Sequence, residues 1–451
     1  MRRVGEMCGR MCREGMRREE ICRERKTCKK KRAGRGGDCV EYMELKKELR
    51  RRVQEKIDFV KDLSDDEVAQ TIDEVLLEQR ELMIYPVELR RRLKKELFDS
   101  LRRLDILQIF VEDCSVTEIM INGKDHIFVE QDGKLRELDI GFESVEKLQD
   151  VIQQIVAGCN RVVNEASPIV DARLPNGARV NIVMNPVALN GPIVTIRRFP
   201  DKPITMERLL QLGSISQEAA CFLETLVKAG YNIFISGGTG SGKTTFLNVL
   251  SHYIPSEERV ITIEDSAELQ LQGLPNLVRL ETRNSNVEGC SEITIRELIR
   301  ASLRMRPDRI IVGEVRGAEA IDMLQCLNTG HDGSMSTGHA NSARDMLARL
   351  ENMVLMGMEL PLAAIRQQIA SGVDILVHLG RLRDKSRRVL EITELVGCEN
   401  NEIKLNPLYE FEELGEDSEG KVMGRLQKKG GLLCENKLRA AGLSILPMAE
   451  R

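Results

Sequence analysis

The chain has no tryptophan and few other aromatic residues. Its 451 residues include 5 Tyr and 10 Phe, so that aromatic side chains make up only 3% of the sequence. Proteins that bind single-stranded nucleic acids usually combine a basic groove with aromatic side chains on which bases stack. The formal net charge is −4. The composition therefore gives no general indication of a nucleic-acid-binding protein.

Long apolar segments and paired cysteine motifs are also absent from the sequence. No window approaches the roughly 18 consecutive apolar residues of a transmembrane helix. The start MRRVGEMCGRMCREG lacks the apolar centre of a secretory signal, so a cytoplasmic location is expected. The 12 cysteines include no CxxC pair, which favours reduced thiols. Five of them match no zinc-binding spacing: Cys8, Cys12, Cys22, Cys28 and Cys39.

The composition and periodicity of the sequence change along the chain. Residues 1–39 carry 14 Lys and Arg against 6 Asp and Glu, and they contain few large apolar residues, which is typical of a disordered basic arm. Helical spacing of apolar residues follows, then short β-rich pieces with turn signals, then alternating strands and helices. The expected parts are an arm (1–40), a helical bundle (41–107), an α+β domain (108–200), a linker (201–213), an α/β domain (214–396) and a C-terminal extension (397–451).

Alternating strands and helices in the α/β part predict a parallel sheet with helices on both faces. The predicted strands are 232–236, 259–263, 309–313, 334–338 and 374–378. In the α+β part we expect strands around 118–123, 127–129 and 193–198, with one helix over 145–156. A hairpin is expected around 417–420.

A glycine-rich segment follows the strand predicted at 232–236. It fits the pattern GxxxxGK[ST], and a helical run comes directly after it. Backbone N–H groups of such a loop surround phosphates, the lysine reaches the outer phosphates, and the hydroxyl after it binds Mg²⁺. The sequence therefore predicts an ATP and Mg²⁺ site at Gly237, Gly238, Thr239, Gly240, Ser241, Gly242, Lys243, Thr244 and Thr245.

Two predicted strands end in carboxylates. The strand 259–263 is followed by Glu264, and the strand 309–313 is followed by Glu314. Since the carboxyl ends of parallel strands lie at the edge of the sheet where ligands bind, both are candidates for catalysis. Gly313 stands where a metal-binding Asp is usual. Glu314 is the candidate for polarising the water and Glu264 for sharing metal or water duty, with the assignment open.

The segment TGHDGSMSTGHANS contains two of the five histidines, His331 and His339. A metal site, an acid/base pair and a sensor of bound phosphate are the competing interpretations. The sequence suggests no further ligands nearby for a metal, and the two glutamates already supply candidate bases. His339, at the end of a predicted strand, is the stronger candidate for the sensor, while His331 is expected to contact a neighbouring loop or subunit.

Four stretches together resemble a known family. They are SGGTGSGKTT (236–245), TIEDSAELQL (262–271), LRMRPDRIIVGEVRGAEA (303–320) and NTGHDGSMSTGHANS (328–342). This set is similar to the secretion ATPases that power type II and type IV secretion and type IV pilus machines, and its details look most like the CpaF-type branch of tight-adherence pili. The segment CSVTEIMINGKDHIFVEQDGKL (114–135) resembles the N-terminal domain of that branch.

The resemblance implies a RecA-like, Mg²⁺-dependent ATPase that works as a homo-hexamer. It implies a peripheral location at the inner face of the cell membrane, where platform proteins are the partners. It also implies arginines of the N-terminal domain and linker on the nucleotide phosphates: Arg197 and Arg198, with Arg173 and Arg179 as weaker candidates. Some arginines near the 309–313 strand are candidates for acting across a subunit boundary: Arg300, Arg304, Arg306, Arg309 and Arg316.

Two other classes of function compete with the secretion motor. A RecA-like core is also found in DNA motors and helicases, but the scarcity of aromatic residues disfavours a nucleic-acid path. A nucleotide-binding regulator without turnover would be expected to have a damaged lysine or carboxylate, and Lys243 and Glu314 are both present. The sequence therefore predicts an ATP-hydrolysing motor for pilus assembly or secretion, with no nucleic acid as partner.

Overall fold

A computed structural model describes residues 37–57, 63–79, 86–131, 133–159, 161–198, 204–283, 291–418 and 420–445. The chain forms two compact units, Met1–Arg198 and Phe199–Arg451, which are described one at a time. Residues 1–36 of the expected basic arm, with their four cysteines, and the linker residues 199–203 lie outside the described residues. Helix α2 begins at Gly37, so the end of the expected arm is helical.

Three helices form the bundle expected at the start of the first unit: α2 (Gly37–Lys56), α3 (Asp65–Glu78) and α4 (Val87–Arg102). Ser64 begins α3 with a capping box, in which its hydroxyl accepts from the Glu67 N–H and the Glu67 carboxylate accepts from the Ser64 N–H. The core is formed by apolar side chains at helical spacing: Leu49, Val53, Val68, Ile72, Val75, Leu93 and Leu97.

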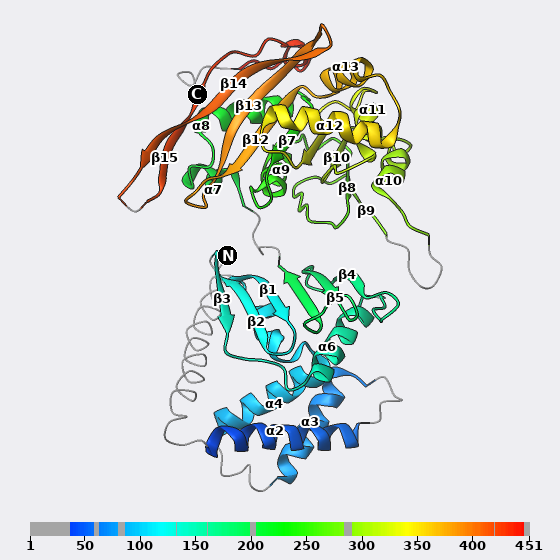
Figure 1. Ribbon diagram of the computed structural model, residues 1–451, viewed down its shortest axis with the longest axis vertical. Helices are drawn as coiled ribbons and strands as arrows, with labels where there is room; N and C mark the ends of the chain where they lie inside the picture. The colour runs from blue at the N-terminus through cyan, green and yellow to red at the C-terminus, as the bar shows by residue number, and fades with distance from the viewer. Residues whose placement is uncertain are drawn as a thin grey trace. The chain divides into compact units, whose positions relative to one another are not determined.

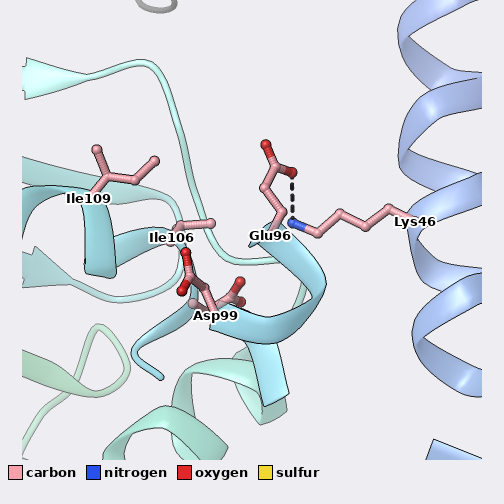
Figure 2. A pocket seen from close by; sticks show the side chains of 6 residues that line it. Lys46, Glu96, Asp99, Ile106 and Ile109 are labelled. Atoms are coloured by element: carbon pink, nitrogen blue, oxygen red, sulfur yellow. Dashed lines mark ion pairs between the residues drawn. The ribbon is translucent and has the colours of Figure 1, made fainter. Parts of the chain in front are cut away.

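A small charged pocket lies between the bundle and the turn that follows α4 (Figure 2). That turn consists of η3 (Asp105–Leu107) and α5 (Gln108–Glu112). Lys46 pairs with Glu96 at 3.2 Å, and burial raises the pKa of Asp99 to about 6. None of the residues predicted to bind the nucleotide lines this pocket.

The α+β part is one antiparallel six-stranded sheet in the order β3-β2-β1-β6-β5-β4. Side chains that alternate along β1 and β2, such as Ile119 and Val129, pack with the apolar face of helix α6. These elements are β1 (Val116–Asn122), β2 (His126–Gln131), β3 (Lys134–Leu138), α6 (Val145–Ala157), β4 (Ile169–Arg173), β5 (Arg179–Val183) and β6 (Ile193–Arg197).

The second unit is built on a nine-stranded sheet in the order β15-β14-β13-β12-β7-β11-β10-β8-β9. Strands β9, β8, β10, β11, β7 and β12 are parallel, and β13 to β15 continue the sheet as antiparallel strands. The strands are β7 (Ile233–Gly237), β8 (Val260–Glu264), β9 (Leu277–Glu281), β10 (Arg309–Val312), β11 (Met335–Gly338), β12 (Ile375–Arg381), β13 (Arg387–Glu399), β14 (Glu402–Glu416) and β15 (Val422–Lys428).

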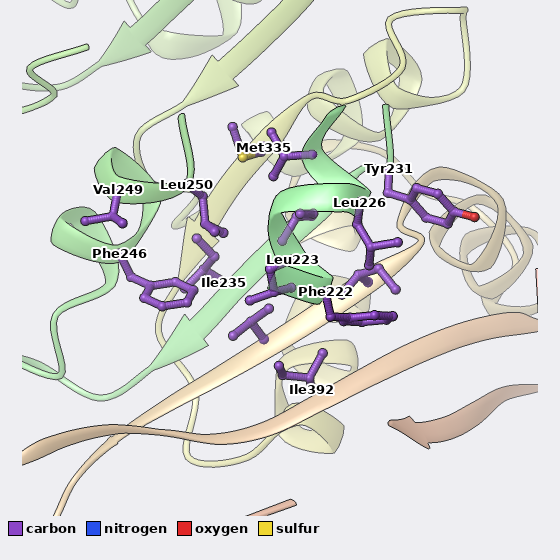
Figure 3. Close-up of a cluster of buried hydrophobic side chains, with 14 of the residues drawn as sticks. Phe222, Leu223, Leu226, Tyr231, Ile235, Phe246, Val249, Leu250, Met335 and Ile392 are labelled. Carbon is purple, nitrogen blue, oxygen red and sulfur yellow. The ribbon is translucent and has the colours of Figure 1, made fainter. Parts of the chain in front are cut away.

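Helices cover both faces of this sheet (Figure 1). One apolar cluster includes Phe222 and Leu250 beside Ile235 of the sheet (Figure 3), and another includes Ile299, Leu324 and Met353. The helices are α7 (Met206–Gln211), α8 (Gln217–Lys228), α9 (Lys243–Ser251), α10 (Ile295–Ser302), α11 (Glu319–Leu327), α12 (Ala343–Gly357), α13 (Leu362–Gly372) and α14 (Asn436–Ala440).

The α/β fold expected from the sequence is confirmed. All five predicted strands of the parallel sheet are present with ends shifted by three residues or fewer, and the order of β8, β10, β11, β7 and β12 is RecA-like. Strand β9 and the length of the β13–β15 extension had not been expected. Within the described part of the chain, no helix combines the length and apolarity needed to cross a membrane.

Candidate nucleotide-binding site

The predicted phosphate loop lies between β7 and α9. Gly242 caps α9 with φ 95°, a left-handed conformation that glycine adopts without strain. A Cβ at Gly237 would overlap the Leu379 carbonyl and the Ser241 hydroxyl, so this position also requires glycine. The helix begins at Lys243, inside the glycine-rich pattern, whereas the helical run was expected directly after it. The N-terminus of α9 therefore directs its N–H groups into the loop.

The side chains of this loop fit a polyphosphate ligand. Lys243 Nζ donates to the carbonyls of Gly237 at 3.0 Å and Gly238 at 3.1 Å. The Ser241 hydroxyl is buried without a hydrogen-bond partner. Burial lowers the pKa of Lys243, while the charge of Glu314 raises it. ATP would supply phosphate oxygens that accept hydrogen bonds from this ammonium and this hydroxyl.

The two candidate glutamates come to the same edge of the sheet. Strands β8 and β10 are parallel neighbours, and Val312 pairs with Ile263. Glu264 ends β8, and Glu314 lies two residues beyond Val312. Both carboxylates thus follow the carboxyl ends of their strands, as expected, and the structure adds that the two strands are neighbours.

Glu264 is a buried carboxylate with one oxygen left without a partner. Glu264 is 3% exposed. Its Oε1 accepts hydrogen bonds from the N–H groups of Glu268 and Leu269 at 2.9 Å each. Oε2 has no hydrogen-bond partner. Burial raises the pKa of Glu264 to about 7, although the two backbone hydrogen bonds lower it. A cation beside Oε2 would stabilise the ionised form.

Gly313 explains how Glu264 fits into this site. A Cβ at position 313 would come within 2.8 Å of Glu264 Cγ, well inside normal contact distance. The glycine that replaces the usual metal-side Asp thus leaves room for a carboxylate from the neighbouring strand. Together with the Thr244 hydroxyl, Glu264 fits the binding of Mg²⁺, which prefers carboxylate and hydroxyl oxygens and would neutralise phosphate charge when bound.

His339 connects the phosphate loop to Glu314. Its Nδ1 lies 3.2 Å from Lys243 Nζ, and its Nε2 lies 2.9 Å from Glu314 Oε1. Arg316 donates to Glu314 Oε2 at 2.8 Å. The imidazole follows β11, the strand between β7 and β10. The structure therefore gives His339 contacts with both the lysine and the glutamate, as a phosphate sensor requires.

The charges around His339 favour an ionised glutamate and a neutral imidazole. Burial raises the pKa of Glu314, but the hydrogen bond and charge of Arg316, together with the charges of His339 and Lys243, bring the pKa below its usual range. Burial and the charge of Lys243 lower the pKa of His339. At neutral pH the ring is therefore uncharged and presents Nδ1 as an acceptor to Lys243, while its Nε2 lies close to Glu314 Oε1 without a hydrogen bond.

His331 precedes the N-terminal end of β11, whereas His339 follows the C-terminal end. Its Nδ1 is 3.2 Å from the Cys326 carbonyl, so it contacts the end of α11. The next residue, Asp332, pairs with Lys437 of the C-terminal segment at 2.7 Å. Within the described ranges, no group of three or more His, Cys, Asp or Glu side chains is arranged to hold a metal ion. The two histidines thus belong to different surroundings and do not form a pair.

The arginines around β10 have different environments. Arg309 is 2% exposed and forms a two-bond pair with Glu258 of the same unit, so its position is structural. Arg300 pairs with Asp322 at 2.9 Å. Arg304 and Arg306 are exposed. Arg316 is bound to Glu314 and is the arginine of this set that lies in the site.

The first unit places three arginines in one row. Arg173 of β4 is paired with Arg179 of β5, which is paired with Arg197 of β6. Directly opposite residues present their side chains on the same face of a sheet. Arg198, the next residue, donates instead to the Asp113 carbonyl. Arg197 and the two weaker candidates thus share a face, while Arg198 is engaged within its own unit.

Two residues of the site were not predicted from the sequence. His378 of β12 is hydrogen-bonded to Ser236, the residue before the phosphate loop, and Arg387 of β13 donates to the Gly240 carbonyl at 2.9 Å. Both depend on β12 being the neighbour of β7, which single-sequence patterns do not reveal. The available signal was that the strand predicted at 374–378 ends in a histidine.

The sequence of this chain is similar to those of known secretion proteins. The family model described as "Type II/IV secretion system protein" matches residues 101–429. A putative conjugal transfer protein of Mycobacterium tuberculosis is 36% identical over 296 residues, covering 64% of this chain and 84% of its own. The conjugal transfer protein TrbB of Rhizobium radiobacter is 32% identical over 325 residues, covering 71% and 96%.

Solved structures of similar chains have also been found. The VirB11 ATPase from the Brucella suis type IV secretion system is 30% identical with a TM-score of 0.36, and 64% of this chain and 92% of that chain are covered. The pilus retraction motor PilT with bound ADP is 21% identical with a TM-score of 0.48, covering 76% and 88%. Because the family model spans most of the sequence, the chain belongs to the type II/IV secretion system protein family.

Proposed function

We propose that this chain, an ATPase of the type II/IV secretion family, is the hexameric motor of a membrane machine that assembles a tight-adherence pilus. The observation that carries the proposal is the continuous set of contacts from Lys243 of the phosphate loop through His339 to Glu314. It joins the group that binds the outer phosphates to the carboxylate that faces the attacking water.

The two glutamates take different roles in the proposed reaction. Glu314 is ionised at neutral pH because Arg316 lowers its pKa, and it orients the water for in-line attack on the γ-phosphate. Glu264, with its unpartnered Oε2, would hold Mg²⁺ together with Thr244. The metal would supply charge neutralisation when bound, and Lys243 stabilises the charge that develops on the transferred group. His339 detects that group through its contacts with Lys243 and Glu314.

The arginine row is the proposed source of further positive charge. Like charges on directly opposite residues destabilise a sheet. The row of Arg173, Arg179 and Arg197 continues at Glu118 of β1, which lies directly opposite Arg197, and we propose that arginines of this row contact the nucleotide phosphates. Arg198 would contact the phosphates only after releasing the Asp113 carbonyl.

The assembly and its surroundings follow from the same proposal. Six copies form a ring, the ring lies in the cytoplasm at the inner membrane, and platform proteins of the pilus or secretion machine receive the motion. The family match and the conjugal transfer and type IV secretion names of the relatives support this class of machine. The pilus motor is the first candidate. The names of the relatives favour an export motor as the second candidate.

Three measurements test the proposal. Phosphate release from Mg-ATP tests turnover, and native mass measurement with a non-hydrolysable ATP analogue tests the hexamer. Turnover is then compared after adding either the cytoplasmic domain of a platform protein encoded beside this chain or single-stranded DNA. We expect stimulation by the platform domain. Strong stimulation by DNA alone would support a DNA motor instead, and loss of export with intact pili on gene deletion would select the second candidate.

A further inference from the structure

His378 is a buried histidine next to the phosphate loop. It lies on β12, which is parallel to β7, and the register pairs His378 with Ser236 and Leu379 with Gly237. His378 is 6% exposed and Ser236 is fully buried. The ring therefore stands directly beside the residue from which the phosphate loop begins.

The ring makes two hydrogen bonds to segments that are distant in sequence. Its Nδ1 is 2.9 Å from Ser236 Oγ, and a second hydrogen bond joins it to the backbone of Asn341. Burial lowers the pKa of His378, while the bond to Asn341 raises it. A bond that raises the pKa of histidine uses a ring N–H as donor. The neutral ring thus donates to the Asn341 carbonyl and accepts from the Ser236 hydroxyl.

Asn341 belongs to the loop that carries His339. This loop leaves β11 at Gly338, passes His339 and Asn341, and ends at Ser342, which caps α12 through its hydroxyl. Ser236 leads into Gly237, whose carbonyl accepts from Lys243. One imidazole therefore connects the loop that contains the phosphate-binding lysine to the loop that contains the histidine in contact with that lysine.

We propose that His378 is a positioning residue that holds the His339 loop in register with the phosphate loop, so that His339 meets Lys243 and Glu314 together. This proposal rests on the proposed function of the site and adds a residue that contacts neither nucleotide nor water. If the bridge is lost, the pairing of Ser236 with Gly338 still aligns β7 with β11, but the loops beyond these strands, with Lys243 and His339, are held less firmly relative to each other. Discrimination between ATP and ADP then weakens.

In this proposal the hydrogen bonds of His378 matter more than the bulk of its ring. His378→Leu keeps an apolar side chain in a buried site but leaves the Ser236 hydroxyl and the Asn341 carbonyl without this partner. His378→Asn retains an oxygen that accepts from Ser236. Ser236→Ala removes the other side of the same bond. His126→Leu, at an exposed position of β2, is the matched control for loss of a histidine.

The test measures kcat and KM for Mg-ATP, the ratio of ADP to ATP-analogue dissociation constants, and the melting temperature for the full chain. We expect His378→Leu to lower kcat about tenfold with KM changed less than about twofold, and to reduce the nucleotide ratio. His378→Asn recovers most of the loss, and Ser236→Ala combined with His378→Leu is less than additive. His126→Leu behaves as the unmodified chain.

Two outcomes would overturn the proposal. One is unchanged kcat and nucleotide ratio in His378→Leu. The other is an equal loss in His378→Leu and His378→Asn that follows the melting temperature, which marks a packing role only. If the unmodified chain does not turn over ATP, the proposed function fails, while the nucleotide ratio still decides the role of His378.

Discussion

Replacing Glu264 by Gln is expected to stabilise the protein in a pH-dependent way. Glutamine has nearly the same shape, and its amide oxygen still accepts from the N–H groups of Glu268 and Leu269, which now bond to the carboxylate. The substitution removes only the charge that burial disfavours. Without nucleotide and Mg²⁺, the variant should therefore unfold at a higher denaturant concentration than the unmodified chain at alkaline pH.

The magnitude follows from the pKa of about 7, against an ordinary value of 4.5. A raised carboxyl pKa contributes stability that is fully present below the unfolded value and is lost as pH rises through the folded value. The difference of 7 − 4.5 corresponds to about 3 kcal/mol as an upper bound. The advantage of Glu264→Gln should therefore be absent below about pH 4.5, grow across the interval to pH 7 and level off above it.

Urea unfolding of the two chains at a series of pH values measures this advantage. Glu257→Gln, at an exposed position, controls for the general loss of a carboxylate. A constant difference between Glu264→Gln and the unmodified chain across the series would refute the reasoning. So would a difference that grows toward acid, because that sign belongs to a carboxylate stabilised in its ionised form. Added Mg-ATP should stabilise the unmodified chain more than the variant.

Three further results are expected. Gly313→Ala should lower the free energy of unfolding by about 1–3 kcal/mol in urea, because its Cβ meets Glu264 Cγ; an effect no larger than that of Gly431→Ala, whose Cβ meets nothing within 4 Å, would contradict this. Arg309→Met should lower the free energy of unfolding by about 3 kcal/mol, because it leaves Glu258 without its buried partner. Arg425→Met, in an exposed pair, should lower it by less than about 1 kcal/mol. Equal losses in the two variants would contradict this expectation. Arg197→Ala should lower kcat about tenfold or more, with Arg208→Ala as control and unchanged turnover as the opposing outcome.

The parallel sheet could be predicted because its strands are short apolar runs between turn signals. Such runs as Arg309-Ile310-Ile311-Val312 are buried on both faces, and the glycine loop fixed which strand begins the nucleotide site. The C-terminal extension was predicted only in part: the hairpin expected around 417–420 is the turn between β14 and β15, but the lengths of β13 to β15 were not expected. These long strands alternate many charged residues, for example Glu410, Glu412 and Glu413, that face solvent and pair with basic neighbours. Their period is visible, but their partner strands are set by tertiary contacts.

The residues of the candidate site that could be predicted are those whose type has a single chemical use at its place in the sequence. Lys243, Glu264 and Glu314 follow from the loop and from the ends of strands, and the structure brings them together. The separation of His331 from His339 could also be predicted, because the strand expected at 334–338 lies between them and is present as β11. His378 was missed, since its role depends on the order of β12 and β7.

The most direct test of the proposed motor is the turnover of Glu314→Gln. Glutamine preserves the shape of the side chain but removes the negative charge that Arg316 and His339 surround. We expect the variant to bind an ATP analogue with a dissociation constant within about threefold of the unmodified chain, and to lose at least about 100-fold in the rate of phosphate release in a single-turnover experiment. Normal phosphate release by Glu314→Gln would contradict the account.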